Sequence, residues 1–170
     1  MTRPTRDGWG LQLAQVTASR STCLRRSVGC VLVDKRGHIL ATGYNGVAAG
    51  QKHCNEDLLL APPPFEGTWA EGTNIKYTHY PHACPGAQSL SGTNLDGCQA
   101  IHAEQNALLQ CGKVWEIDTC YTTTAPCMTC VKLLLNTSCQ RIVFKEDYPH
   151  SEARVLWENA GRIWLQLKEK

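Results

Sequence analysis

Two short segments of the sequence carry the residue types from which a metal site is built. His102 and Glu104 lie on either side of an alanine, and Cys127 and Cys130 follow Pro126 later in the chain. Two thiolates and one imidazole make three protein ligands for zinc, which leaves the fourth tetrahedral position for water. Zinc lowers the pKa of that water towards neutrality, so that it can act as a hydroxide nucleophile. Glu104 can take the proton of this water and deliver it to a substrate ring and then to a leaving amine.

Other interpretations of these residues are less complete. A closed structural zinc site, in which a fourth cysteine replaces water, would leave Glu104 without a task. A redox pair is expected to follow a thioredoxin-like strand–helix–strand unit, and none precedes Cys127. The ten cysteines could also form disulfides, but disulfide density is typical of small secreted domains with weak cores. A chain of 170 residues, 42% of them hydrophobic and with no secretory signal evident in 1–20, favours metal ligands and small core residues instead.

Both metal-binding segments are predicted to lie at the starts of helices. Residues 100–111 are predicted to form a helix that ends at Gly112, and Pro126 occupies a position typical of the start of a second helix, which ends at Asn136. Because helix N-termini stabilise anions, this placement favours the thiolate forms of Cys127 and Cys130.

The elements that must position these helices alternate along the chain. We expect helices at 9–18 and 151–160, the latter with Ser151 as its cap, and strands at 28–33, 38–42, 119–124, 141–145 and 162–167. This order predicts an α/β fold in a single domain, 1–170, with one sheet and helices on its faces. Residues 47–99 differ, because they are rich in Pro, Gly, Thr and Asn and lack periodicity. They are predicted to form a loop-rich insert within the domain, which a metal could hold together.

The H-x-E and P-C-x-x-C segments together are the signature of zinc nucleobase deaminases. From about residue 19 to the last strand, the chain resembles the deoxycytidylate (dCMP) deaminases of the cytidine deaminase superfamily. Besides the metal segments, the resemblance rests on Ser21–Gly29, on Gly43-Tyr44-Asn45-Gly46 and on the continuation of H-A-E through Gln105-Asn106-Ala107. It implies a three-layer α-β-α fold with a central mixed sheet of about five strands and a long insert after the first hairpin.

The resemblance implies hydrolysis of dCMP to dUMP and ammonia, which would supply dUMP for thymidylate synthesis. Glu104 is then the catalytic residue, His102, Cys127 and Cys130 hold the catalytic zinc, and the candidate substrate-binding residues are Ser21, Arg26, Asn45 and Tyr148. The residues alone leave alternatives open. Arg20, Arg25 and Arg26 could bind a phosphate or form a solvated basic turn. Asn45 could hydrogen-bond the sugar or phosphate, and Tyr148 could contact the base or phosphate or be a partly buried surface aromatic.

Some members of the resembled family carry a second, structural zinc in the insert region. The preferred ligands here are Cys23, Cys54, Cys84 and Cys98, because four thiolates close a structural zinc site. His53 is an alternative to Cys54, and His79 and His82 are further candidates. The four other cysteines lie within or beside predicted regular elements and are expected to be small core residues: Cys30, Cys111, Cys120 and Cys139.

The resemblance also implies a hexamer that dCTP activates and dTTP inhibits, with bound Mg²⁺. The regulator would bind near Gly43, Tyr44 and Gly46. Other functions stay open: deamination of another cytosine nucleotide, deamination of adenosine on transfer RNA, or a catalytically silent zinc module that binds nucleic acid. A net charge of +2 does not provide a broad basic face, and no apolar run approaches the ~20 residues that span a bilayer. We therefore expect nucleotide ligands, no nucleic-acid or membrane partner, and a cytoplasmic location (host cytoplasm if the source is viral).

Overall fold

The computed structural model describes residues 3–56, 82–89, 93–94, 96–148 and 151–168. Its contacts divide the chain into two compact units. The first comprises Met1–Ser21, Val28–Asn45 and His102–Lys170, and the second comprises Thr22–Ser27 and Gly46–Ile101. The second unit thus corresponds closely to the predicted insert, joined by a short segment that precedes the first strand. The assignment of the whole chain to one domain stays a prediction.

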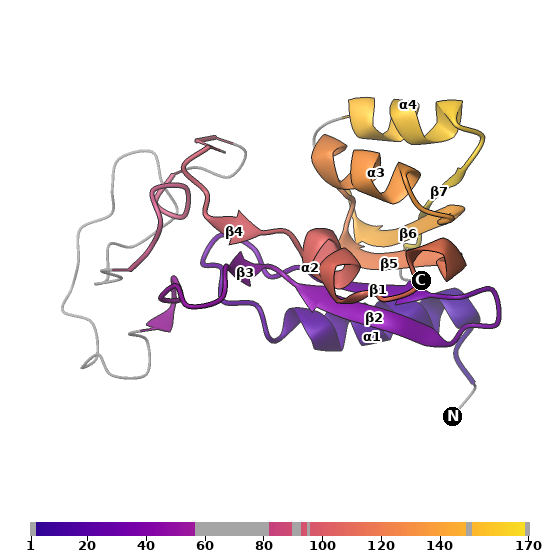
Figure 1. Ribbon diagram of the computed structural model, residues 1–170, viewed down its shortest axis with the longest axis horizontal. Helices are drawn as coiled ribbons and strands as arrows, with labels where there is room; N and C mark the ends of the chain where they lie inside the picture. Colours follow the sequence, from indigo (N-terminus) through magenta and orange to yellow (C-terminus); the bar gives the residue numbers. More distant parts are fainter. Residues whose placement is uncertain (1–2, 57–81, 90–92, 95, 149–150, 169–170) are drawn as a thin grey trace. The chain divides into compact units, whose positions relative to one another are not determined.

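A five-stranded mixed sheet forms the centre of the first unit (Figure 1). Its strands, in spatial order, are β2 (Ile39–Tyr44), β1 (Gly29–Val33), β5 (Thr119–Thr124), β6 (Arg141–Glu146) and β7 (Ile163–Gln166). The β1 strand pairs antiparallel with both of its neighbours, whereas β5, β6 and β7 are parallel. The β2 and β5 strands therefore run in the same direction, and their carboxyl ends lie at the same edge of the sheet. The predicted mixed sheet of about five strands is confirmed.

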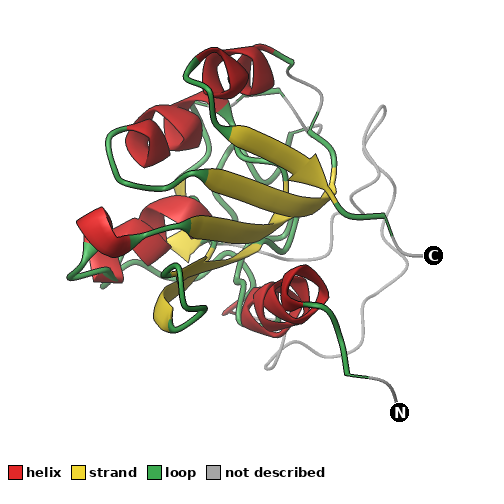
Figure 2. Cartoon of the chain, turned by 90° about the vertical axis from the view of Figure 1, so that its right-hand side faces the viewer, coloured by secondary structure: helices red, strands yellow, loops and turns green. Residues whose placement is uncertain are grey.

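Helices cover both faces of this sheet. The α1 helix (Arg6–Ala18) lies on one face, and α2 (Ala103–Gln110), α3 (Met128–Leu135) and α4 (Glu152–Asn159) lie on the other (Figure 2). The strands alternate accordingly: Leu32 belongs to the core cluster under α2 and α3, whereas its neighbours Val31 and Val33 pack towards α1. This period of two is what a strand buried on both faces requires. The α-β-α layering expected from the resemblance is present.

Three details differ from the elements predicted along the sequence. Ala100–Ile101 is not helical but forms β4, which pairs with β3 (Gly46–Val47) in a separate two-stranded sheet of the second unit. The α2 helix consequently begins at Ala103, because the backbone of the preceding residues is already used in strand pairing. Ser151 does occupy the N-cap position of α4, but its side chain makes no capping hydrogen bond. A short 3-10 helix, η2 (Val114–Glu116), was not predicted.

The four cysteines that were expected to be packing residues are buried. Cys30, Cys120 and Cys139 are fully inaccessible, Cys111 is 8% exposed, and all four belong to the same core cluster. The sulfur atoms of Cys30 and Cys120 lie 3.5 Å apart across neighbouring strands. Their assignment as small core residues is confirmed. In the part of the chain that the structure describes, no helix combines the length and the apolar character needed to cross a membrane.

Candidate metal centre

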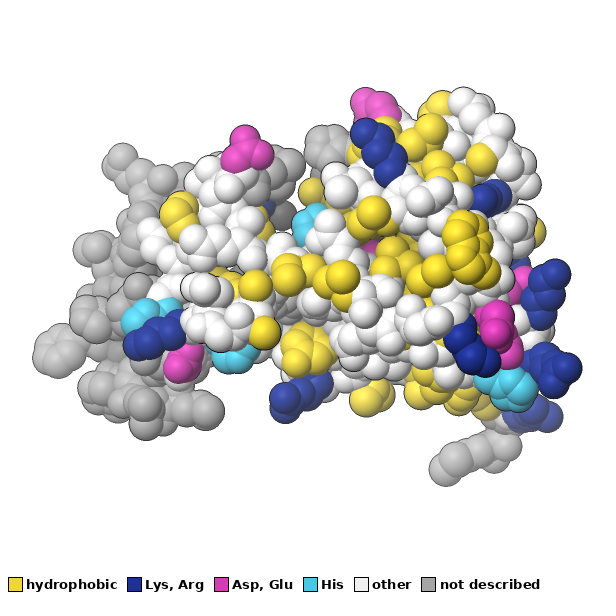
Figure 3. Space-filling model, viewed as in Figure 1, with side chains coloured by type: hydrophobic (Ala, Val, Ile, Leu, Met, Phe, Trp, Pro, Cys, Tyr) yellow, Lys and Arg dark blue, Asp and Glu magenta, His cyan; other side chains and the backbone are white. Residues whose placement is uncertain are grey.

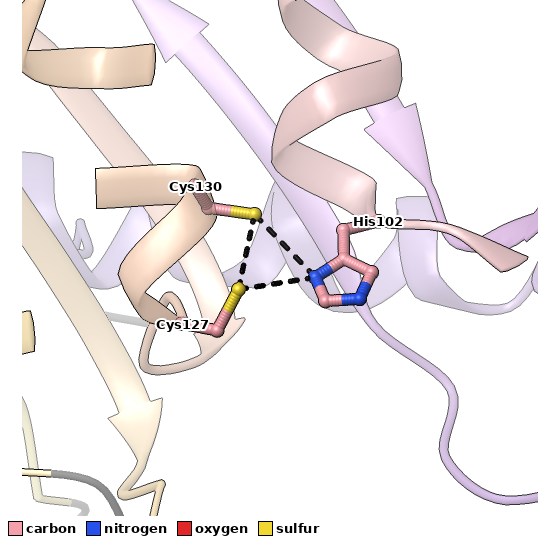
Figure 4. A group of neighbouring side chains, drawn as sticks. All are labelled: His102, Cys127 and Cys130. Atoms are coloured by element: carbon pink, nitrogen blue, oxygen red, sulfur yellow. Dashed lines mark hydrogen bonds between the residues drawn. The ribbon is translucent and has the colours of Figure 1, made fainter. Parts of the chain in front are cut away.

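Three candidate ligands converge where α2 and α3 begin. His102 is the N-cap residue of α2, Cys127 is the N-cap residue of α3, and Cys130 lies in the first turn of α3. The Nδ1 atom of His102 is 3.4 Å from each sulfur, and the two sulfurs are 3.7 Å apart (Figure 4). Among the described residues, this is the one group of three or more candidate ligands whose donor atoms all lie within 4.8 Å of one another. The geometry matches a three-ligand zinc site with one position left for water.

Local structure explains why these side chains face one another. The N-cap backbones of His102 and Cys127 are extended, so each side chain leaves its helix at the end and not along its side. The Oε1 atom of Gln105 accepts the backbone N–H of His102 at 2.8 Å, which fixes the entry into α2. The side chain of Cys127 makes no capping hydrogen bond with α3, so its sulfur remains directed towards the other two ligands.

The three candidate ligands shift one another's pKa. Hydrogen bonding to the Cys130 sulfur, together with a bond to His102, lowers the pKa of Cys127 to about 4 in spite of burial. The hydrogen bond with Cys127 raises the pKa of His102, and the same partner, together with burial, raises the pKa of Cys130. The thiolate form is thus favoured at Cys127 and disfavoured at Cys130. Because a divalent cation binds the deprotonated forms of cysteine and histidine, metal binding would displace protons from this group.

Glu104 adjoins this group from the first turn of α2. Its side chain is only 3% exposed, and the Cys130 sulfur donates a hydrogen bond to its Oε2 atom at 3.4 Å. Burial is the main cause that raises the pKa of Glu104 above its ordinary value, although its own backbone N–H and the His102 charge oppose the shift. A buried carboxyl group with a raised pKa beside a metal site is suited to accept and return a proton near neutral pH.

Most of the chain matches a known protein family. Residues 4–146 match the model of the cytidine and deoxycytidylate deaminase zinc-binding region. The chain belongs to this family. The matched range contains His102, Glu104, Cys127 and Cys130, so the converging side chains lie within the family's zinc-binding region.

Relatives with curated names support the same assignment. The chain is 34% identical to the deoxycytidylate deaminase of Saccharomyces cerevisiae over 94% of its own length and 33% identical to that of Schizosaccharomyces pombe over 98%. It spans only 44% of the length of each of these yeast relatives. It is also 34% identical to the deoxycytidylate deaminase of Mycobacterium phage D29, with 86% of this chain and 99% of the phage protein covered.

Solved structures show the fold of this deaminase family. The apo dCMP deaminase of cyanophage S-TIM5 aligns with a TM-score of 0.64 and 22% identity, covering 98% of this chain and all of that chain. The same phage protein in complex with dCMP and dUMP gives a TM-score of 0.63 and 23% identity. The cytidine deaminase-like fold is therefore confirmed.

Asn45 stands at the carboxyl end of β2 in a network of fixed hydrogen bonds. Its Oδ1 atom accepts the Val28 backbone N–H at 2.8 Å and the Ser21 hydroxyl at 2.7 Å, and its own N–H donates to the Val28 carbonyl at 3.1 Å. The side chain is 8% exposed. Because the Val28 N–H can only donate, the amide oxygen of Asn45 is assigned to this position. The Ser21 hydroxyl, which was predicted to bind substrate, is directed at Asn45.

The other predicted binding residues have varied surroundings. Tyr148 is half-buried against the main core cluster just after β6. Arg26 is half-buried in the second unit, in the segment Thr22–Ser27. Arg25, in the same segment, donates to the Gly86 carbonyl at 3.0 Å. At Gly43 the space of a side chain is filled by α2, because a Cβ there would lie 2.3 Å from the Ala103 oxygen.

The cysteines predicted for a second zinc all belong to the second unit. Cys54 and Cys84 are 3% and 4% exposed, share a side-chain hydrogen bond, and belong to one small core cluster with Ala87. Burial and the nearby charges of Cys84 and Cys23 raise the pKa of Cys98. The four thiols therefore affect one another's pKa. Their sulfur atoms do not all lie within 4.8 Å of one another, as the donor atoms of His102, Cys127 and Cys130 do. His53 is exposed, His82 is half-buried, and His79 lies outside the described residues.

One polar residue beside the site had no role assigned from the sequence. Asn106 lies two positions after Glu104 on α2, and its Nδ2 atom donates to the Tyr44 carbonyl at 2.7 Å. Its place in the E-x-N-A continuation marked it as part of the resemblance, but only the fold shows that its partner lies at the end of β2.

Proposed function

We propose that the chain is a zinc-dependent deaminase that hydrolyses dCMP to dUMP and ammonia. The observation that carries this proposal is a buried carboxyl group, Glu104, that accepts a hydrogen bond from Cys130, one of three side chains that converge as metal ligands. The curated relatives bear the name deoxycytidylate deaminase, and the S-TIM5 protein of the same fold has been solved with dCMP and dUMP. A silent zinc module would have no use for a buried, proton-accepting carboxylate at this position.

Each group in the site has a defined chemical task in this proposal. His102, Cys127 and Cys130 would hold zinc, which supplies a Lewis acid able to lower the pKa of a water molecule to near 7. Glu104 accepts a proton from the attacking water and returns it to the ring nitrogen next to the reacting carbon. A C–O bond forms at C4 of cytosine, and the new C4 hydroxyl then gives its remaining proton to Glu104, which passes it to the amino group. The C–N bond breaks, ammonia leaves, and the C4 oxygen becomes the carbonyl of uracil.

We propose that Asn45, Arg26 and Tyr148 contact the substrate. The side-chain N–H groups of Asn45 suit an acceptor oxygen of the sugar or phosphate. A guanidinium group such as that of Arg26 suits a phosphate. Because its hydroxyl is directed at Asn45, Ser21 would act on the substrate through Asn45. On the face shown in Figure 3, basic side chains gather mainly at the right-hand end, with acidic side chains beside them. The net charge of only +2 favours a mononucleotide over a long nucleic acid.

The direct test is an assay of ammonia and dUMP formation by the purified, zinc-loaded chain. dCMP, CMP, cytidine and dCTP are compared as substrates at the same concentration, and zinc per chain is measured in parallel. The expected result is turnover of dCMP above the other three. If none of the four compounds releases ammonia, the proposed activity is refuted. If another cytosine nucleotide is turned over faster than dCMP, that nucleotide and not dCMP is the preferred substrate.

Regulation and assembly are part of the same proposal. We propose that dCTP, with Mg²⁺, activates the enzyme and that dTTP inhibits it, through a site that includes Gly43, Tyr44 and Gly46, in a hexamer. The assay is repeated with each triphosphate at several dCMP concentrations, with and without Mg²⁺, and the mass of the assembly is measured by light scattering. Hyperbolic kinetics unaffected by either triphosphate would contradict the regulatory part only.

We also propose that a second, structural zinc binds in the second unit. Burial raises the pKa of Cys84, but the backbone N–H groups of Gln99, Ala87 and Gly86 near its sulfur, together with the hydrogen bond to Cys54, bring the net pKa below its ordinary value. Such amide donors are typical around a metal thiolate, and Cys23, Cys54 and Cys98 would complete the set. Two zinc ions per chain are expected, falling to one in Cys84→Ala but not in Cys111→Ala. One zinc in the wild-type protein would contradict the second site.

A further inference from the structure

Asn106 links the helix of the proposed catalytic residue to the strand that precedes Asn45. Its Nδ2 atom donates to the Tyr44 carbonyl at 2.7 Å, and its own backbone N–H donates to the His102 carbonyl at 2.9 Å. Asn106 therefore lies one helical turn after a proposed zinc ligand and two residues after Glu104. Tyr44 is the residue immediately before Asn45. A single side-chain hydrogen bond thus joins two segments that are far apart in the sequence.

The contact between these two segments leaves little freedom to move. A Cβ atom on Gly43 would lie 2.3 Å from the Ala103 oxygen and 2.3 Å from the Ala107 nitrogen, so the β2 backbone lies directly on the α2 backbone. This close approach fixes how far apart the helix and strand are. The hydrogen bond from Asn106 to the Tyr44 carbonyl adds a directional constraint to this packing, at the end of β2 that leads to Asn45.

Asn45 directly follows Tyr44, and two hydrogen bonds fix the position of its side-chain amide. The Val28 N–H and the Ser21 hydroxyl both donate to its Oδ1 atom. A displacement of the Tyr44 carbonyl would move the next residue and turn its amide away from these donors. Misplacement of a substrate-positioning group by 1 Å can cost on the order of 100-fold in rate.

We infer that Asn106 is a positioning residue, which sets the place of the Asn45 amide relative to Glu104 through its hydrogen bond to the Tyr44 carbonyl. This inference rests on the proposed function, since it assigns Asn45 to substrate binding and Glu104 to proton transfer. Asn106 itself takes no part in the reaction. It acts on the substrate only through Asn45.

A double-mutant cycle separates this role from a merely structural one. Asn106→Asp keeps the size of the side chain but removes its donor, and kcat, KM and zinc content are measured for wild type, Asn106→Asp, Asn45→Ala and the double variant. We expect kcat/KM for dCMP to fall by on the order of 10-fold or more in Asn106→Asp, with zinc retained. In the Asn45→Ala background the same substitution should cost less than about threefold, because its target is already absent. Gln110→Ala, on the exposed end of α2, serves as the control and should match wild type.

Each result then has a clear meaning. Equal losses in both backgrounds, or wild-type kinetics in Asn106→Asp, would overturn the inference while leaving the proposed deaminase intact. If Asn106→Asp does not fold, Asn106→Ala, which removes the donor and adds no charge, is placed in the same cycle and judged by the same criterion. A wild-type chain that releases no ammonia from any cytosine nucleotide would instead overturn the proposed function, and with it this inference.

Discussion

Substitution of Gly43 by alanine tests whether the contact between α2 and β2 positions the site. The added Cβ would lie 2.3 Å from two backbone atoms of α2, the Ala103 oxygen and the Ala107 nitrogen, and 2.9 Å from the Ala107 Cα. None of these belongs to a flexible side chain. To reach an ordinary contact of 3.4 Å, the helix must therefore retreat by about 1 Å. That helix carries His102 at its start and Glu104 in its first turn.

The expected cost follows from this displacement. Overpacking of a buried backbone contact destabilises a protein by about 1–3 kcal/mol, and a shift of about 1 Å in a reacting group lowers the rate on the order of 100-fold. Urea unfolding gives the first quantity, and steady-state deamination of dCMP gives the second. Gly112→Ala is the matched control, because its Cβ would meet nothing within 4 Å; it should stay within about 0.5 kcal/mol of wild type and keep full activity.

The reasoning is refuted if Gly43→Ala unfolds at the same urea concentration as Gly112→Ala and turns over dCMP at the wild-type rate. That result would mean that α2 can move away from β2 without consequence for Glu104. Loss of stability without loss of activity per folded molecule would refute the positioning argument alone.

Three further predictions follow from the same structure. Glu104→Gln should retain the wild-type zinc content but lose nearly all turnover, since an amide cannot accept and return a proton; metal analysis and the ammonia assay check this. Dialysis against a chelator should abolish activity and zinc should restore it, as measured by the same assay. Burial and the hydrogen bond to Asp7 raise the pKa of Tyr121 to about 12, above the value near 10 of an unfolded tyrosine. The contribution of the Tyr121 hydroxyl to the free energy of unfolding is complete below pH 10 and is lost as the pH rises through about 12. The difference in the free energy of unfolding between wild type and Tyr121→Phe should therefore shrink between about pH 10 and pH 12.

The sequence was most informative where the chemistry is local. Each half of the metal centre is a short motif at a helix start, and the elements that carry these motifs have clear periodicity. The one boundary error near the site, at residues 100–101, has a physical reason. Two residues of strand are too short to show alternation, and their partner, Gly46–Val47, lies far away in the sequence.

Contacts between distant residues could not be predicted in this way. The hydrogen bond from Asn106 to the Tyr44 carbonyl and the link from Asp7 to both Tyr121 and Arg141 depend on which strands become neighbours. No spacing rule connects such residues. Asp7 precedes the helix expected at 9–18, although α1 in fact begins at Arg6, and Tyr121 belongs to an expected strand. Neither pattern indicates that the two side chains form a hydrogen bond.

The order of the strands explains why two separate motifs form one site. The β1 strand is antiparallel to both β2 and β5, so these two strands end at the same edge of the sheet. The end of β5 leads through Pro126 to Cys127, and the end of β2 carries Tyr44 and Asn45. The α2 helix, which brings His102 and Glu104, is attached to that end of β2 by Asn106. If β1 were parallel to only one of these neighbours, the two motifs would lie at opposite edges. The shared direction of β2 and β5 is therefore a requirement of the metal centre, and Asn106 is the contact through which the helix is aligned with it.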